Sequence, residues 1–405
     1  MNKLEDTLYL SARDAATELA VSPATLYAYV SRGLIRSEPG ENPRSRRYRA
    51  EDVRGLKSRR APMPDGQGLK AADLPILDSA ISTITEAGSI YRGVYAVSLS
   101  QSATFEQAAT LLWDSKESDP FAKTNLPIIS PAMRKILEAT RNVVPTDRTI
   151  AVLALAAEAD PRAYNSVAEG RAAIGARILR LVISAMIGAE PSAEPLHRQI
   201  TRAWAPNGRH AEDLIRRTLV LLADHELNAS TFTVRCAVST GISLYDAVIA
   251  GLVALKGPKH GGAGPLASKL VDTLLEGDIA AIVRERVALG ERFAGFGHLI
   301  YRKGDPRGIS LLEELTKAGA DKRLTIEVPE RIAEATGAFV NIDYALAVMC
   351  KTLQLPRGSE TAIFAMARTA GWIAHAIEQL ESQVLIRPRA RYVGPAPRVR
   401  LFSVV

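Results

Sequence analysis

The sequence has few cysteines, few aromatic residues and no long hydrophobic run. Its two cysteines, Cys236 and Cys350, cannot build a disulfide framework, and both lie in apolar stretches where buried, reduced thiols are expected. No uninterrupted apolar segment reaches the roughly 20 residues that a membrane-spanning helix needs. The start, MNKLEDTLYL, lacks the basic beginning and apolar centre of a secretory signal. We therefore expect a cytoplasmic protein that does not enter a membrane.

The sequence also lacks the usual signatures of metal and nucleotide cofactors. It contains no Cys/His cluster and no HExxH, so no metal site is expected. It contains neither a Walker loop nor a G-x-G-x-x-G that follows a strand. We therefore expect no cofactor, and a ligand that carries phosphate would be a substrate.

The remaining composition is typical of a soluble helical protein with more than one domain. Hydrophobic residues make up 47%, charged residues 23% and aromatic residues 5%, while alanine and leucine recur throughout, which favours packed helices. Long apolar segments with helical spacing at 171–188, 211–227 and 243–257 predict helices. The length of 405 residues predicts two or more units. The net charge of +7 suits anionic partners, which include both nucleic acid and CoA.

The first 60 residues have the pattern of a small separate module. Ser11 can cap a first helix, and Ser22 followed by Pro23 can begin a second. A basic stretch follows at 44–60. The module resembles the MerR-type and excisionase-type DNA-binding domains, in which the second helix of a helix-turn-helix enters the major groove and a wing follows. The fold expected for this part is therefore a small winged helix-turn-helix.

The resemblance implies that this module binds DNA. The residues expected to contact bases or phosphates are Thr25, Tyr27, Arg32, Arg46 and Arg47. Arginines of this kind supply the salt-sensitive part of DNA binding. Helix-turn-helix shapes also serve in dimerisation and docking, and this alternative stays open. Turn-forming residues at 61–66 predict a flexible joint, so we place the boundary at residue 62, between a module at 1–62 and a body at 63–405.

Short polar segments are spread through the body of the chain. They are DHELNAS (224–230), GPKHGG (257–262), GFGHLIYRKGDPR (295–307), NID (341–343), MARTAGW (366–372) and IRPR (386–389). Their order and spacing resemble the active-site segments of citrate synthases, and the resemblance runs from about Ile81 to the C-terminus. It implies a mainly α fold with a large and a small domain, the small one inserted at about 263–360 and closing over the substrates.

The resemblance assigns catalytic roles to three residues. Asp343 matches the base that removes a methyl proton from acetyl-CoA, and His260 matches the donor to the thioester carbonyl. His298 matches the donor to the carbonyl of oxaloacetate. A Claisen-type condensation needs such groups because the methyl proton is weakly acidic and the ketone must be polarised.

The resemblance also assigns residues that hold the substrates. His225, Arg307 and Arg368 match groups that bind oxaloacetate, and Arg302 matches an arginine that contacts a CoA phosphate. Arg387 matches an arginine that comes from the neighbouring subunit, which implies a homodimer with a shared active site. Arginine suits these roles because its planar fork donates two parallel hydrogen bonds to a carboxylate.

Two departures from the family pattern lie beside these motifs. Gly264 and Pro265 stand where the family usually has Asn-Glu or a similar polar pair, and Leu299 stands where many bacterial members have arginine. The first departure adjoins the site and concerns substrate preference or rate.

The expected activity is that of citrate synthase, which converts acetyl-CoA and oxaloacetate into citrate and CoA. An alternative is 2-methylcitrate synthase, which uses propionyl-CoA, because one methylene changes binding in an apolar pocket by only about 1–3 kcal/mol. A second alternative is a DNA-binding regulator that senses a metabolite with a citrate synthase-like body.

Overall fold

The computed structural model describes most of the body of the chain and part of the N-terminal module. The described residues are 9–19, 21–31, 34–40, 45–50, 52–53, 77–165, 167–390 and 392–394. The chain divides into two compact units, Met1–Asp78 and Ser79–Val405. The joint at 61–66 and the boundary at residue 62 lie outside the described residues and stay predictions. Among the described residues, no helix combines the length and the apolar character needed to cross a bilayer.

The described part of the N-terminal unit contains the helices α1 and α2 and a three-stranded antiparallel sheet. Its elements are β1 (Tyr9–Ser11), α1 (Ala12–Glu18), α2 (Pro23–Ser31), β2 (Ser37–Pro39) and β3 (Arg46–Arg49), and β3 lies between the other two strands. Ser11 caps α1 as predicted, since its side chain accepts the backbone N–H of Asp14. The hydroxyl of Ser22 accepts the N–H of Thr25 at 3.3 Å, in the first turn of α2. The buried core is small and consists of Ala15, Ala16, Leu19, Leu26, Ile35, Tyr48 and Val53.

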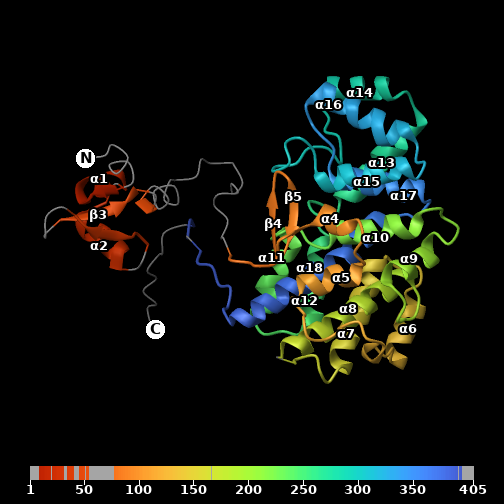
Figure 1. The fold of residues 1–405 in the computed structure, drawn as a ribbon, viewed down its shortest axis with the longest axis horizontal. Helices are drawn as coiled ribbons and strands as arrows, with labels where there is room; N and C mark the ends of the chain where they lie inside the picture. The colour runs from red at the N-terminus through yellow and green to blue at the C-terminus, as the bar shows by residue number, and fades with distance from the viewer. Residues whose placement is uncertain are drawn as a thin grey trace, which may run out of the picture. The chain divides into compact units, whose positions relative to one another are not determined.

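The C-terminal unit is mainly helical, with one small sheet near its start (Figure 1). Its elements are β4 (Ser82–Thr85), β5 (Gly88–Tyr91), β6 (Val94–Tyr95), α4 (Ala96–Ser100), α5 (Phe105–Leu112), η2 (Lys123–Asn125), α6 (Pro131–Ala139), α7 (Pro145–Ala159), α8 (Ala168–Ile187), α9 (Leu196–Trp204), α10 (Ala211–Leu222), α11 (Ala229–Val238), α12 (Leu244–Leu255), α13 (Ala263–Glu276), α14 (Ile279–Ala288), α15 (Pro306–Lys317), the π-helical turn η3 (Arg323–Glu327), α16 (Val328–Thr336), α17 (Ile342–Thr352) and α18 (Ser359–Ser382). The helices predicted at 171–188, 211–227 and 243–257 are confirmed as α8, α10 and α12. The antiparallel sheet in the order β4-β5-β6 was not predicted from the sequence.

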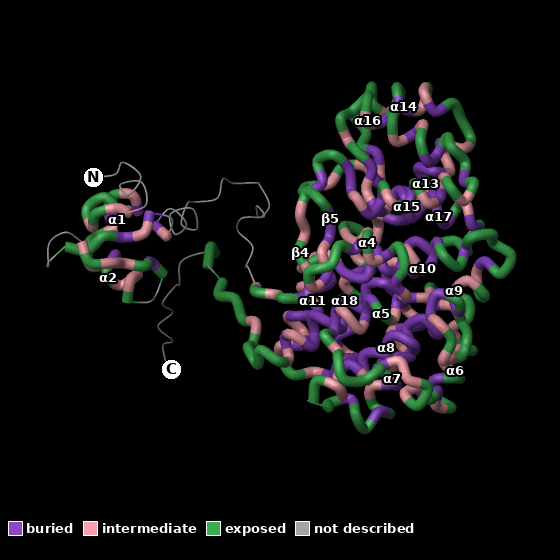
Figure 2. The backbone as a smooth tube through the Cα atoms, viewed as in Figure 1, coloured by how far each residue is buried: buried purple, intermediate pink, exposed green. Residues whose placement is uncertain are grey.

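Helix α18 is the central element of this unit. Its 24 residues are buried over most of their length, and it packs against α8, α10, α11 and α12 (Figure 2). A helix that is apolar around most of its circumference must lie inside the protein, because no face of it suits water. Gly251 of α12 gives the fully buried ring of Trp372 room, since a Cβ at this position would lie 2.7 Å from the ring. This packing fixes the polar residues of α18 relative to the other helices.

Helices α13 to α17 lie together at one end of the C-terminal unit (Figure 1). They span the region of about 263–360, in which the smaller domain was predicted. These helices belong to the same compact unit as the other helices after Ser79. Within this group α17 packs against both α13 and α15. Cys350 of α17 is buried as expected, whereas Cys236 is only half-buried because it lies on the less buried face of α11.

Candidate active site

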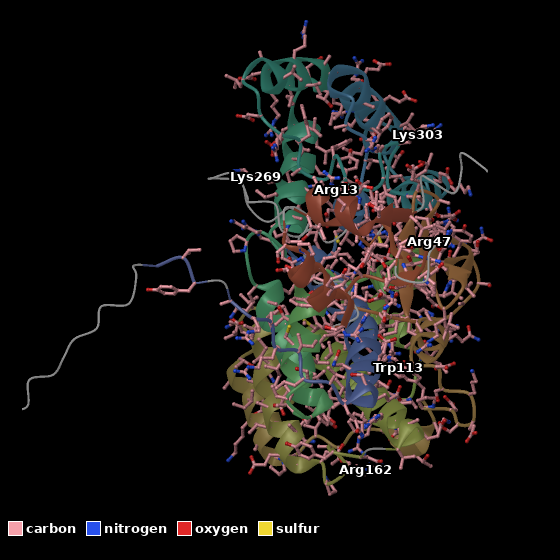
Figure 3. All side chains as sticks on the ribbon, turned by 90° about the vertical axis from the view of Figure 1, so that its left-hand side faces the viewer. Arg13, Arg47, Trp113, Arg162, Lys269 and Lys303 are labelled. Atoms are coloured by element: carbon pink, nitrogen blue, oxygen red, sulfur yellow. The ribbon has the colours of Figure 1, made fainter. Side chains whose placement is uncertain are left out.

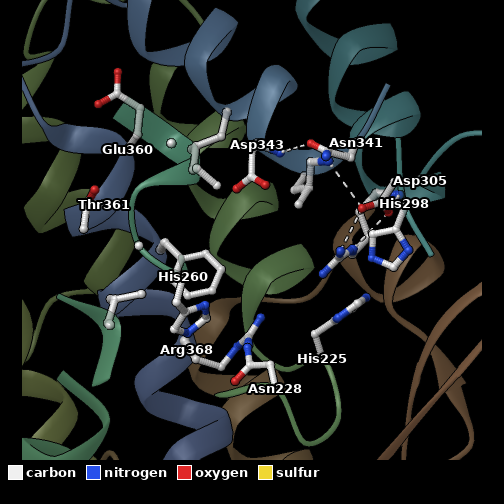
Figure 4. A pocket seen from close by; sticks show the side chains of 18 residues that line it. His225, Asn228, His260, His298, Asp305, Asn341, Asp343, Glu360, Thr361 and Arg368 are labelled. Carbon is white, nitrogen blue, oxygen red and sulfur yellow. Dashed lines mark hydrogen bonds and ion pairs between the residues drawn. The ribbon is translucent and has the colours of Figure 1, made fainter. Parts of the chain in front are cut away.

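A single cavity of about 180 Å³ gathers the polar segments that the sequence separates (Figure 4). Its lining residues are His225, Asn228, Leu255, His260, Gly261, Ala263, Gly264, His298, Asp305, Arg307, Asn341, Ile342, Asp343, Leu346, Glu360, Thr361, Phe364 and Arg368. All three predicted catalytic residues and three of the predicted substrate-binding residues are among them. Within the part of the chain that the structure describes, no group of three or more His, Cys, Asp or Glu side chains is arranged to hold a metal ion.

Asp343 stands in the first turn of α17 and faces the cavity. The side chain of Asn341 caps this helix by accepting the N–H of Asp343 at 2.9 Å, which fixes the start of α17. Burial raises the pKa of the Asp343 carboxyl, with Asp305 acting in the same direction and Arg307 and Arg368 acting against it. A carboxylate that is poorly solvated is a stronger base than an exposed one.

His260 is held by a hydroxyl group that lies behind it. Its Nε2 lies 2.8 Å from Oγ of Ser230, and this oxygen also accepts the indole N–H of Trp372 at 3.1 Å. The hydroxyl proton of Ser230 can go to His260 or to Oδ1 of Asn228, at 3.0 Å. In the first arrangement Nδ1 of His260 carries the ring proton and is a donor. Burial lowers the pKa of His260, as does Arg368, so the imidazole is neutral near pH 7.

The close approach of the His260 loop depends on glycine. A Cβ at Gly261 would collide with the carbonyl oxygen of Leu255, and one at Gly262 would collide with that of Pro258. Both glycines are therefore positions of close backbone approach, where a side chain would not fit.

His298 and His225 lie next to each other, with ring centroids 5.6 Å apart. Nδ1 of His298 accepts the backbone N–H groups of Ile300 and Tyr301, at 3.2 and 3.3 Å, so the proton of the neutral ring is on Nε2. Burial lowers the pKa of His298, and Arg307 adds to this while Asp305 opposes it. Burial together with the nearby arginines also lowers the pKa of His225. Both imidazoles are therefore neutral donors.

Arg307 is 2% exposed and is paired within the chain. Its Nε and Nη2 donate to the two carboxylate oxygens of Asp305 at 3.0 and 2.7 Å. Burial alone lowers the pKa of Arg307, and the adjacent carboxylate more than offsets this, so the pKa lies above its ordinary value. Asp305 was missed by the sequence analysis, although an Asp followed by Pro306 is a typical helix start, and it does cap α15.

Arg368 is 1% exposed and has unused hydrogen-bonding capacity. Its Nε donates to the carbonyl of Leu222 at 3.1 Å, and its guanidinium lies 4.7 Å from the centroid of the Phe364 ring. Among the described residues, its Nη1 has no hydrogen-bond partner. Burial lowers the pKa of this guanidinium. A buried cationic donor without a partner at a cavity wall is suited to bind an anionic ligand.

Two predicted substrate contacts lie outside the cavity. Arg302 is exposed on the loop before α15, and Arg387 is exposed in the extended segment after α18. The predicted roles of Arg302 toward a CoA phosphate and of Arg387 in a neighbouring subunit's site remain predictions.

A buried polar network supports the loop that carries His225. Asp224, His375 and Tyr91 are fully buried, and Nε2 of His375 lies 3.4 Å from a carboxylate oxygen of Asp224. The hydroxyl of Ser82 donates to the same carboxylate. The hydroxyl of Tyr91 donates to the carbonyl of Asp224 at 2.9 Å. His375 is therefore a packed histidine of this network.

The predicted DNA contacts of the N-terminal unit are mostly exposed or half-buried. Tyr27 is 54% exposed and Thr25 is half-buried. Arg46 and Arg47 are exposed on β3, and Arg47 is labelled in Figure 3. The guanidinium of Arg47 lies 4.6 Å from the ring centroid of Tyr9. Arg32 lies outside the described residues.

Known proteins resemble most of this chain. Residues 68–389 match the family model for the C-terminal domain of citrate synthase. The chain is 31% identical over 348 residues to Citrate synthase 2 of Bacillus subtilis, covering 78% of this chain and 93% of that protein. It is 35% identical over 201 residues to 2-methylcitrate synthase of Shewanella oneidensis, covering 48% of this chain and 53% of that protein. A ternary complex of citrate synthase from the thermophilic archaeon Thermoplasma acidophilum with carboxymethyl coenzyme A and oxaloacetate superposes with a TM-score of 0.66 at 26% identity, covering 81% of this chain and 96% of that one.

Proposed function

Because this chain belongs to the citrate synthase family, we propose that it condenses acetyl-CoA with oxaloacetate and hydrolyses the resulting thioester to citrate and CoA. The enzyme is an acyltransferase of the citrate synthase type. The observation that carries the proposal is that one cavity brings together Asp343, His260, His298 and two buried arginines, Arg307 and Arg368. The structural resemblance to a citrate synthase complexed with a CoA analogue and oxaloacetate supports these substrates.

Asp343 and His260 carry out the first step of this proposal. The carboxylate of Asp343 removes a proton from the methyl group of acetyl-CoA, and its raised pKa makes it a better base for this task. Negative charge develops on the thioester oxygen, where the N–H of a neutral His260 stabilises it. The contact between His260 and Ser230 supports this role in the arrangement where the Ser230 hydroxyl donates to Nε2, because the ring proton is then on Nδ1.

His298 and the two arginines act in the second step. The arginines hold the carboxylates of oxaloacetate, and His225 adds a donor beside them. The N–H on Nε2 of His298 polarises the ketone, which is then attacked by the nucleophilic carbon from the first step. The ketone oxygen takes up one proton to become the hydroxyl of the citryl thioester, and this balances the proton that Asp343 removed from the methyl group. Water then cleaves the thioester and releases CoA and citrate.

The preferred acyl group has a second candidate. The relatives include a 2-methylcitrate synthase, so propionyl-CoA is the alternative substrate, and acetyl-CoA is the one we propose. We further propose a homodimer in which Arg387 reaches the neighbouring site and Arg302 meets a phosphate of CoA. The exposure of both arginines leaves them accessible for these contacts.

The N-terminal unit is proposed to be a winged helix-turn-helix that binds DNA. The exposed Tyr27 on α2 and the exposed Arg46 and Arg47 on β3 support this role. A dimer would carry two such units and suit a two-fold symmetric site. We propose a cytoplasmic enzyme of this kind rather than a pure metabolite sensor, because sensing alone does not need the base Asp343.

The test is release of CoA, followed with a thiol reagent in the presence of oxaloacetate and either acetyl-CoA or propionyl-CoA. We expect turnover with acetyl-CoA. Absence of turnover with both thioesters, in a folded protein that binds oxaloacetate, would contradict the enzyme and favour the sensor.

A further inference from the structure

Along α18 the cavity wall presents first an acidic, then an aromatic and then a cationic side chain. Glu360, Phe364 and Arg368 are spaced by four residues, so they follow one face of the helix over about 12 Å. All three line the cavity, and Phe364 stands between the other two along the helix. Figure 4 shows Glu360 on one side of the cavity and His298 on the other, with Asp343 between them. The cationic side is the proposed site of oxaloacetate.

Glu360 is a buried acid that the proposed mechanism does not use. It is 6% exposed, and among the described residues its side chain makes no hydrogen bond or ion pair. Its carboxylate oxygens are not fully enclosed, so water can reach them. Burial raises the pKa of the Cys350 thiol, and the charge of Glu360 adds to this effect. Glu360 therefore lies near Cys350, which is two helical turns after Asp343 in α17. A buried carboxylate is costly unless a donor or water satisfies it. Water that enters the cavity can be this donor when no ligand supplies one.

Gly264 makes room for this glutamate. A Cβ at Gly264 would lie 3.0 Å from Cβ of Glu360, closer than side chains normally approach each other. The first turns of α13 and α18 therefore meet at this point, and a larger residue at 264 would displace Glu360. Gly264, which departs from the family pattern, thus provides the space that Glu360 occupies.

We propose that Glu360 sets the acyl preference of this enzyme, favouring acetyl-CoA over acyl groups with a longer apolar chain. The inference rests on the proposed function. The reacting carbon must face both Asp343 and the ketone of oxaloacetate, so an added methyl group must point away from the cationic side. It then approaches Phe364 and Glu360 and displaces the water that hydrates the carboxylate. A methyl group donates no hydrogen bond in return, so propionyl-CoA is disfavoured.

The test compares acetyl-CoA with propionyl-CoA in the wild type and in two variants. Glu360→Leu replaces the carboxylate with an apolar side chain of similar size, and Glu360→Gln keeps the shape without the charge. We expect the wild type to favour acetyl-CoA in kcat/KM by roughly tenfold or more. Glu360→Leu should raise the ratio of propionyl-CoA to acetyl-CoA by about tenfold, and Glu360→Gln by less. Glu330→Leu, an exposed position in the first turn of α16, is the matched control and should leave the ratio unchanged.

Two results would overturn the inference. They are a wild type that prefers propionyl-CoA and a ratio that Glu360→Leu does not change. If the ratio stays constant because activity falls equally with both thioesters, Glu360 lies against the CoA arm that they share. If the wild type turns over neither thioester, the proposed function fails. Calorimetric binding of the two thioesters to wild type and Glu360→Leu then decides the inference, because a preference unchanged by the variant contradicts it.

Discussion

The arginines predicted to hold oxaloacetate and those predicted to contact DNA lie in opposite environments within their units. In the C-terminal unit Arg307 and Arg368 are 2% and 1% exposed, whereas in the N-terminal unit Arg46 and Arg47 are exposed on a strand. A buried guanidinium is stable only when fixed partners satisfy it, so its position specifies one anion in one orientation. An exposed guanidinium is well hydrated and acts mainly through its charge, which salt screens. Buried arginines therefore recognise an anion mainly by its shape and orientation, whereas exposed arginines recognise it mainly by its charge.

The largest effect is expected from removing the base in the buried site. Asp343→Asn should lower kcat by about 10²–10⁴-fold, since an amide cannot take the methyl proton. Asp147→Asn, in the first turn of α7 and outside the cavity, is the control and should retain activity. The measurement is CoA release at saturating substrates. Near-normal kcat in Asp343→Asn would remove Asp343 from the mechanism.

Replacing arginine with lysine tests the comparison directly, because it keeps the charge and removes the planar fork. Arg368→Lys should raise KM for oxaloacetate by about 10- to 100-fold, the range expected for losing one or two charged hydrogen bonds. Arg46→Lys should leave retention on DNA nearly unchanged, because a phosphate contact needs mainly charge. Steady-state kinetics and a filter-binding assay give the two readouts. If Arg368→Lys and Arg46→Lys weaken oxaloacetate binding and DNA retention by the same factor, the two units do not differ in how their arginines recognise anions.

The pH dependence should also differ between the units. Burial raises the pKa of Asp343, so the carboxylate that acts as base is lost at a higher pH than for an exposed aspartate. Below that pKa, kcat should fall by about tenfold per pH unit. Burial lowers the pKa values of His260 and His298, so both rings stay neutral to a lower pH than an exposed imidazole does.

The matched measurement is DNA retention over the same pH range. Arginines stay protonated throughout, so retention should not follow the activity. If kcat begins to fall only at the pH where an ordinary exposed aspartate titrates, the base is not desolvated. Asp343→Asn should lose the limb, together with most of the activity.

The smallest effect is expected on the exposed surface. Replacing both Arg46 and Arg47 with alanine should reduce the slope of log affinity against log salt by about 1.8, which corresponds to two phosphate contacts. Retention at low ionic strength should fall several-fold, while kcat should not change. The check is DNA retention across a salt series, with Arg162→Ala of the C-terminal unit, whose side chain is 56% exposed, as the control. A wild type that shows no salt-dependent retention would contradict DNA binding altogether.

Much of the site could be predicted from short segments of sequence. Caps such as Ser11 and helices such as α8 follow from local patterns, because each depends on hydrogen bonds or apolar spacing within a few turns. The motifs around His260, His298 and Asp343 also identified residues that line one cavity. The short sheet β4-β5-β6 was not predicted, since its strands have only two to four residues and depend on each other for hydrogen bonds.

The sequence by itself determined the helical body, the family and the types of group that the chemistry uses. Only the tertiary structure decided which partners these groups have and how deeply they are buried. The pairing of Arg307 with Asp305, the contact of Ser230 with His260, and the burial of Glu360 against Gly264 were not predicted. The last two join residues far apart in sequence, and all three depend on how the helices pack around the cavity. Local patterns set which side chains a helix presents, but desolvation and partner distances arise only when the helices enclose a common space.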